Sequence, residues 1–476
     1  MSETMRWRLK SAVVATAVIA GAVVSCAQAF ADTLESALAQ AYVNNPQLNA
    51  QRAVVRATDE GVPSALAGYR PRAAVTANVG MQSLSTTIRE IGSTTPRGAP
   101  ASYFTQSGAN TPHGVGATVT QTVLNGFQTS NRTRLAENQV LAARETLRNI
   151  EQTVLLSATT VYMNLLRDGA ILQLQRSNVE VLQEQLRQAR QRLQSGNVTA
   201  TDVSQSESRL EVGRTQVFAA EANYETSRAV YRQVIGVDPG KLSSAAPVDR
   251  FAPNALGSAV AIGTSQNPNV NVAQHNVDIA LLQVKIAEGA LYPTVTVQGS
   301  VQKNYESALN SLQTFNASIG GQVSVPIYQG GAEFASIRQA KETHGQRQLD
   351  LDVARDQARA VVVQAWAQLE AAKSSIESTK AQVKSAEAAL NGVREEARLG
   401  QRTTLDVLNA QQELVSARIA MVAAQRDRLV NSYGLLSAVG HLSPQVLGLK
   451  VPKYDPVVHY QQVRDSWAGV RTPDGR

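Results

Sequence analysis

The chain has 476 residues, of which only 5% are aromatic, and a formal net charge of +7. So few aromatic side chains argue against several independently packed globular domains, whereas Ala, Val and Leu suit long helices that pack closely. The modest positive excess, spread over a long chain, does not indicate a nucleic-acid partner.

Residues 1–31 predict a secretory signal peptide, so we expect the mature chain to start at Asp32. Its three parts are the basic residues Arg6, Arg8 and Lys10, the apolar run 12–24, and the small-x-small site Ala29-Phe30-Ala31. A membrane anchor is the alternative, but the apolar run is shorter than the ~20 residues of a spanning helix. The residues before Cys26, the only cysteine, weakly resemble a lipoprotein acylation box, so lipidation stays open.

Two copies of one pattern follow each other along the chain. At an offset of 222 residues, 44–51 matches 266–273 and Pro71 matches Pro293. At an offset of 204 residues, Gly126, Gly196 and Gly236 match Gly330, Gly400 and Gly440. The offsets differ by 18 residues, which predicts a longer loop in the first copy, roughly over 82–113. We therefore predict a first repeat over 32–254, a second over 255–440 and a C-terminal tail over 441–476.

Each copy begins with a helical stretch that ends before Pro71 or Pro293, because proline disfavours helix in the residue before it. Two period-2 strands follow in each copy, near residues 75–81, 115–123, 295–301 and 319–327. Strands of about ten residues suit a tilted bilayer crossing, provided that the sheet closes and leaves no edge in lipid. Four strands cannot close around a lumen, so a spanning chain must oligomerise, and three copies would supply twelve strands.

A long stretch without proline follows each strand pair, over residues 113–238 and 327–443. Large apolar residues recur every seventh position in both: Leu165, Leu172, Val179 and Leu186, then Val362, Leu369, Ile376, Val383 and Leu390. This period predicts a left-handed coiled coil, and a helix of ~65 residues would be roughly 100 Å long. Gly196-Asn197 and Gly400-Gln401 interrupt the helices and predict tight helix-to-helix turns.

The sequence offers no catalytic, cofactor or metal motif. The histidines share no metal-ligand spacing: His113, His275, His344, His441 and His459. No Gly-x-x-x-x-Gly-Lys run for a phosphate occurs. We therefore expect a protein that is not an enzyme and that holds no cofactor.

In their joint order, the motifs resemble the TolC-like outer-membrane factor family over essentially the whole predicted mature chain. The motifs are Thr33 to Leu38 with Asn45-Pro46, Tyr69-Arg70-Pro71, Gly196 to Val203, and Gly400 to Leu408. The resemblance implies an α+β membrane protein, a homotrimer whose twelve-stranded outer-membrane β-barrel continues into a long helical coiled-coil periplasmic tunnel. It further implies a passive duct for efflux or type I secretion, opened when an inner-membrane pump (RND or ABC type) and a periplasmic adaptor dock. Outer-membrane lipid would surround the barrel, and the C-terminal tail would lie in the periplasm.

Carried over by position, the periplasmic entrance gate comprises Thr201, Asp202, Arg402 and Asp406. Some family members have a second acid where this chain has Asn409, which puts strong cation selectivity in doubt. Physically, a ring of carboxylates in a narrow aqueous passage favours cations, and an arginine bonded across helices can latch them. The alternative is that Asp202 and Asp406 merely cap their helices.

A periplasmic coiled-coil adaptor or spacer without a pore is the competing function. It explains the heptads but not four amphipathic strands of membrane-crossing length.

Overall fold

The computed structural model describes residues 33–89, 103–196, 198–307, 312–473 and 475. The predicted signal peptide, Asp32 and Cys26 lie outside the described residues. The chain divides into two compact units. The sheet unit comprises Asn45–Leu156, Val248–Ala372 and Asn431–Arg476, and the turn unit comprises residues 33–44, Ser157–Pro247 and Lys373–Val430. Each unit takes segments from both predicted repeats, whose boundaries stay predictions.

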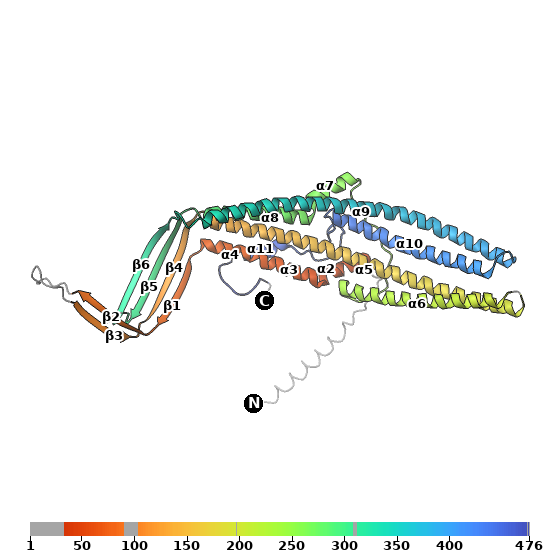
Figure 1. Cartoon of the computed structure of the whole chain (residues 1–476), viewed down its shortest axis with the longest axis horizontal. Helices are drawn as coiled ribbons and strands as arrows, with labels where there is room; N and C mark the ends of the chain where they lie inside the picture. Colours follow the sequence, from red (N-terminus) through yellow and green to blue (C-terminus); the bar gives the residue numbers. More distant parts are fainter. Residues whose placement is uncertain (1–32, 90–102, 197, 308–311, 474, 476) are drawn as a thin grey trace, which may run out of the picture. The chain divides into compact units, whose positions relative to one another are not determined.

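The sheet unit contains a four-stranded antiparallel sheet with strand order β1-β4-β5-β6 (Figure 1). Its strands are β1 (Arg72–Val79), β4 (His113–Asn125), β5 (Thr294–Tyr305) and β6 (Gln313–Ser324). The four predicted strands are thereby confirmed, although β6 ends before Val325 and Ile327. The strands have 8 to 13 residues, a range that brackets the ~9–11 residues of a tilted membrane-crossing strand.

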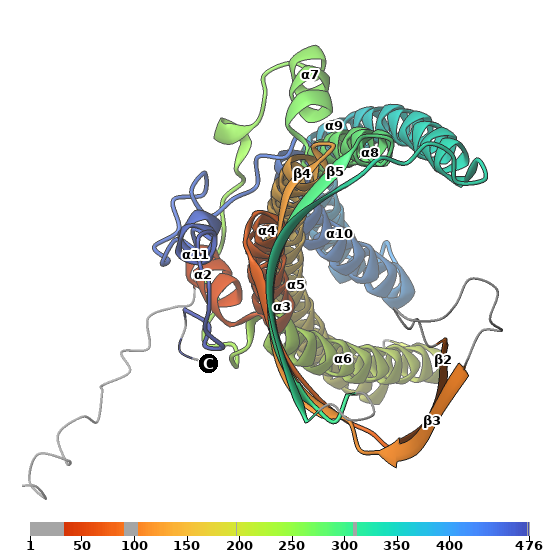
Figure 2. The ribbon, with the colours of Figure 1, turned by 90° about the vertical axis from the view of Figure 1, so that its left-hand side faces the viewer.

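A second strand pair lies within the longer loop that we expected roughly over residues 82–113. It consists of β2 (Gln82–Arg89) and β3 (Tyr103–Asn110), which pair antiparallel. The longer connection in the first copy is confirmed, since 80–112 joins β1 to β4 whereas 306–312 joins β5 to β6. It is not irregular in β2 and β3, because Ser, Thr and apolar residues alternate there and suit paired strands. Figure 2 shows the β2–β3 pair on the concave side of the curved main sheet.

The repeated Asn-Pro motifs start helices in the sheet unit. Asn45 caps α3 (Pro46–Asp59), where its side-chain oxygen accepts from the backbone N–H of Gln47 at 2.9 Å. Asn267 caps α8 (Pro268–Gly289) in the same way. Proline fits the first helical position, because its missing N–H would have no partner there. The repeated Asn-Pro motif therefore marks the start of a helix in each copy.

Shorter elements complete the sheet unit: α4 (Gly61–Leu66), η2 (Ala67–Tyr69), η3 (Asp249–Phe251), α7 (Leu256–Gln266) and α11 (Pro456–Val463). In the C-terminal tail, α11 packs on α3. His459 Nδ1 lies 3.0 Å from Oδ2 of the fully buried Asp59, and burial raises the pKa of that carboxyl. The tail is thus tied down by a buried polar contact.

The long helices repeat with the same offset as the sequence. Helices α5 (Gln128–Gln194) and α9 (Ala332–Arg398) each have 67 residues, and both ends of α9 lie 204 positions after those of α5. Both helices have residues in each unit. The turn unit further contains α6 (Ala200–Ile235), α2 (Leu34–Asn44), which contacts α6, and α10 (Thr404–Ala438) up to Val430. Among the described ranges, no helix is both long enough and apolar enough to cross a membrane.

Candidate functional site

The turn between α5 and α6 carries Thr201 and Asp202. Gly196 adopts a left-handed φ of +74°, which glycine tolerates without strain, and Thr199 then caps α6. Oδ2 of Asp202 accepts from the backbone N–H of Thr199 at 2.9 Å and from its hydroxyl at 2.8 Å. The backbone N–H of Asp202 donates to Thr199 Oγ1 at 3.3 Å. This reciprocal arrangement is a capping box, and Thr201 lies exposed beside it.

The turn between α9 and α10 has the same construction. Gly400 has φ +79°, and Oδ2 of Asp406 accepts from the backbone N–H of Thr403 at 3.0 Å and from its hydroxyl at 2.9 Å. The Thr403 backbone N–H and hydroxyl lower the pKa of Asp406 below its usual range. Both aspartates therefore complete a helix cap through Oδ2, as the third helical residue of a capping box in which Thr199 or Thr403 is the N-cap. The cap uses only Oδ2 of each aspartate.

Arg402 precedes the second capping box and forms an ion pair on its own helical hairpin. Its Nε lies 2.9 Å from Oε2 of Glu396 in α9, and both side chains are about half exposed. This carboxylate, more than Asp406, raises the pKa of Arg402. Within one protomer the expected latch residue thus bridges α9 and the α9–α10 turn.

Asn409 has a partner that sequence reasoning missed. Nη2 of Arg209 in α6 donates to Oδ1 of Asn409 in α10 at 2.9 Å, which joins the two helical hairpins. Arg209 lies one heptad after Asp202 and hence on the same face of α6. The seven-residue spacing from Asp202 is the sequence feature that could have identified Arg209. The contact itself depends on a neighbouring helix 200 residues away.

Polar contacts continue along both hairpins. Arg190 in α5 pairs with Glu207 in α6 at 2.6 Å, and the equivalent residues 204 positions later, Arg394 and Gln411, are hydrogen-bonded at 2.9 Å. Gln411 also donates to Asn178 in α5 at 3.3 Å. One amide side chain therefore connects three helices.

Leu408 provides the apolar attachment between the hairpins. It is 2% exposed and belongs to a cluster whose other members come from α5 and α6: Leu182, Leu186, Ala189, Val203 and Leu210. The equivalent position in the first turn is Ser204, which is exposed. The second turn is thus attached to the first hairpin by a buried leucine, whereas the equivalent Ser204 is exposed.

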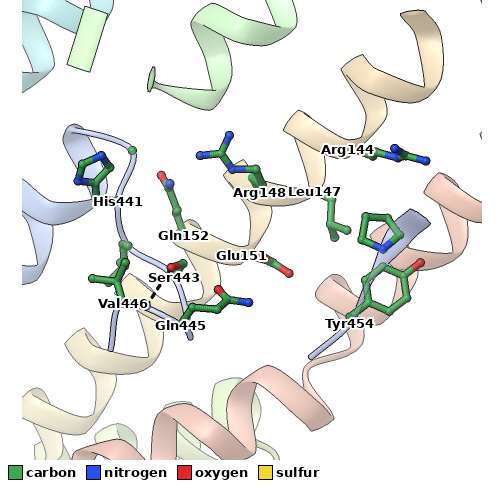
Figure 3. Close-up of a pocket in the computed structure, with 13 residues that line it drawn as sticks. Arg144, Leu147, Arg148, Glu151, Gln152, His441, Ser443, Gln445, Val446 and Tyr454 are labelled. Atoms are coloured by element: carbon green, nitrogen blue, oxygen red, sulfur yellow. Dashed lines mark hydrogen bonds between the residues drawn. The ribbon is translucent and has the colours of Figure 1, made fainter. Parts of the chain in front are cut away.

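The sheet unit holds a cavity of about 450 Å³ between α5 and the segment after α10. The charged ends of Arg144 and Arg148 point in opposite directions there (Figure 3), and Arg148 already pairs with Glu145 at 2.7 Å. The lining groups do not converge on one ligand. Within the described ranges, no group of three or more His, Cys, Asp or Glu side chains is placed to hold a metal ion.

Comparisons with known proteins agree with this architecture. The profile of the family described as "Outer membrane efflux protein" matches residues 37–237 and 264–441. The chain is 40% identical to outer membrane efflux protein BepC of Brucella suis over 98% of each chain. It is 25% identical to outer membrane protein TolC of Escherichia coli, over 62% of this chain and 63% of that protein.

The fold is similar to that of the solved Campylobacter jejuni CmeC outer membrane channel. The TM-score is 0.71 at 16% identity, over 91% of this chain and 89% of that one. The competing function of a spacer without a pore has no support in these relatives. The chain belongs to the outer membrane efflux protein family and is an outer-membrane export channel.

Proposed function

We propose that three copies of this chain form one passive export duct in the outer membrane, without a catalytic step. The observation that carries the proposal is the four-stranded sheet, in which β1 and β6 each pair with only one other strand among the described residues. Open edges are not tolerated in lipid, so β1 of one copy pairs with β6 of the next. Three copies then close a barrel of twelve strands.

The two faces of the sheet suit opposite surroundings. Val75 and Val79 of β1 and Ile319 of β6 are 77%, 84% and 84% exposed in the single protomer, and the register places them on one face. That face contacts outer-membrane lipid. The neighbouring residues Thr76 and Asn78 lie on the other face, toward an aqueous lumen.

The periplasmic end of the duct is controlled at the two helix turns. Thr201, Asp202, Arg402, Asp406 and Asn409 form the entrance gate, which an inner-membrane pump of RND or ABC type opens together with a periplasmic adaptor. Two observations support this assignment: the turns have matching cap geometry, and Asn409 lies where the two hairpins meet. Because position 409 holds an amide rather than an acid, we expect weak cation selectivity.

The mass of the detergent-solubilised particle from isolated outer membranes tests the proposal. We expect a stable trimer of the mature chain that is not released without detergent. A soluble monomer would contradict the shared barrel.

A further inference from the structure

Strands β1 and β2 run against β4 and β3 as one ribbon with continuous register. Val79 pairs with His113 at the end of β1, and Gln82 pairs with Asn110 at the start of β2. Between these pairs, the backbone N–H of Gly80 donates to the carbonyl oxygen of Pro112 at 2.9 Å. No residue is inserted on either side of the ribbon. Side chains therefore keep alternating between the same two faces along its whole length.

The apolar side chains change faces along this ribbon. On β1 they occupy odd-numbered positions up to Met81, on the face that we assign to lipid. On β2 and β3 they occupy even-numbered positions, with Leu84, Ile88 and Phe104 among Thr86, Gln106 and Gly108. The odd-numbered face of β2 and β3 instead carries Ser83, Ser85, Thr87, Tyr103, Thr105, Ser107 and Ala109. Beyond Met81 the apolar face is thus the one that continues the lumen side.

The base of the β2–β3 ribbon is anchored to the second strand pair. Oε2 of Glu306, just after β5, accepts from the backbone N–H of Thr111 at 3.1 Å and from its hydroxyl at 2.7 Å. The backbone carbonyl of Glu306 accepts from the side chain of Asn110. Glu306 has a positive φ of 50°, unusual for a residue with a side chain. These contacts hold the ribbon in one orientation, on the concave side of the main sheet (Figure 2).

We propose that the apolar faces of β2–β3 from the three protomers pack against one another and form a collar that narrows the outer mouth of the duct. This inference rests on the proposed trimer. In the single protomer Leu84, Ile88 and Phe104 are 37%, 55% and 61% exposed, and a two-stranded sheet alone is only marginally stable in water.

A second copy of the chain is the occupant that fits this face. Lipid would select apolar residues on the opposite, odd-numbered face, which is rich in hydroxyl groups here. Around a three-fold axis, the three lumen-side faces approach one another, and identical apolar faces can then bury their side chains together.

Two adjacent cysteine variants test the contact in the full-length, detergent-solubilised protein. Phe104→Cys places a thiol on the apolar face, and Thr105→Cys places one on the opposite face of the same strand. The unsubstituted chain, whose only cysteine is Cys26, serves as the background. With a short bismaleimide, Phe104→Cys should give cross-linked dimers on a denaturing gel and Thr105→Cys should not.

The collar is contradicted if both variants cross-link equally. It is also contradicted if Phe104→Cys does not cross-link in particles of trimer mass. Neither result would contradict the proposed export duct. A monomer mass for the unsubstituted protein would instead contradict the proposed function itself.

Conductance tests the narrowing separately. The triple variant Leu84→Ser, Ile88→Ser and Phe104→Ser should raise single-channel conductance in planar bilayers, since the collar loses its apolar contacts. The triple variant Ser83→Ala, Ser85→Ala and Ser107→Ala on the opposite face is the control and should leave conductance unchanged. An unchanged conductance in the first variant, at trimer mass, would overturn the narrowing.

Discussion

The two helix turns have nearly the same backbone but different side chains around it. Each turn has a left-handed glycine, at φ +74° for Gly196 and +79° for Gly400, followed by a Thr-x-x-Asp capping box. These shared parts are the ones that a sharp reversal between two helices requires. The need for this capping box explains why the aspartates recur at an offset of 204 residues.

The differences lie in the contacts that leave each turn. The second turn inserts Leu408 into the first hairpin, receives a hydrogen bond from Arg209 at Asn409, and carries the Arg402–Glu396 ion pair. The equivalent positions 408, 409 and 402 hold Ser204, Gln205 and Val198 in the first turn. The two turns therefore share the backbone reversal, and a few side chains attach the second turn to the neighbouring hairpin.

Truncating the buried Leu408 should cause the largest difference in stability between the two turns. Leu408→Ala should lower the free energy of opening α10 by about 3 kcal/mol, because it leaves a cavity among packed leucines and alanine. Native-state hydrogen exchange of α10 measures this quantity. Ser204→Ala, at the equivalent exposed position, is the matched control and should change the opening free energy of α6 by less than about 0.5 kcal/mol. Equal effects in the two variants would contradict the asymmetry.

Removing the N-cap hydroxyl should destabilise both turns to the same extent. Thr199→Ala and Thr403→Ala should each destabilise the first turn of the helix that follows by about 1 kcal/mol, because the N-cap hydroxyl no longer accepts from the backbone. Hydrogen exchange of the first turns of α6 and α10 provides the measurement. A loss confined to one turn would show that the two capping boxes are not equivalent.

Low pH should weaken the second cap. The folded-state pKa of Asp406 is lowered, so its stabilisation is fully present above the unfolded value of about 3.9. That stabilisation is lost as the pH falls through the lowered folded pKa. Protection of residues 404–407 from hydrogen exchange, corrected for the intrinsic rate, should therefore persist at pH 5 and decline below pH 4. The same decline in Asp406→Asn would show that another group is responsible.

Exchanging a charged contact for its neutral counterpart should have the smallest effect. Glu207→Gln gives α5–α6 the arginine–glutamine contact that α9–α10 has between Arg394 and Gln411. Arg190 and Glu207 are 59% and 47% exposed, so the opening free energy of α6 should change by no more than about 0.5 kcal/mol. Hydrogen exchange of α6 would detect a larger loss, which would mean that the charge matters beyond the hydrogen bond.

Periodic and local features were predictable from the sequence. The heptads of Leu165 and Val362, the Asn-Pro helix starts and the glycine turns each depend on residues close together in the chain, so their structural consequences can be read locally. The four main strands were likewise visible in their alternation.

Contacts between distant segments were not predictable in the same way. Arg209 was missed because its partner, Asn409, lies on another hairpin, and α10 must pack beside α6 before the contact exists. The length difference between the repeats predicts the longer connection between β1 and β4, but not the strands β2 and β3 within it. Their Ser- and Thr-rich alternation carried the signal for strands.

Single-channel conductance of Arg402→Ala in planar bilayers tests the central claim most directly, namely that side chains of the second turn control the entrance. Val198→Ala, at the equivalent position of the first turn, is the control. The account predicts a higher conductance for Arg402→Ala, because the turn loses its ion pair with Glu396, and an unchanged conductance for Val198→Ala. An unchanged conductance for Arg402→Ala, in particles that remain trimers, would contradict the account.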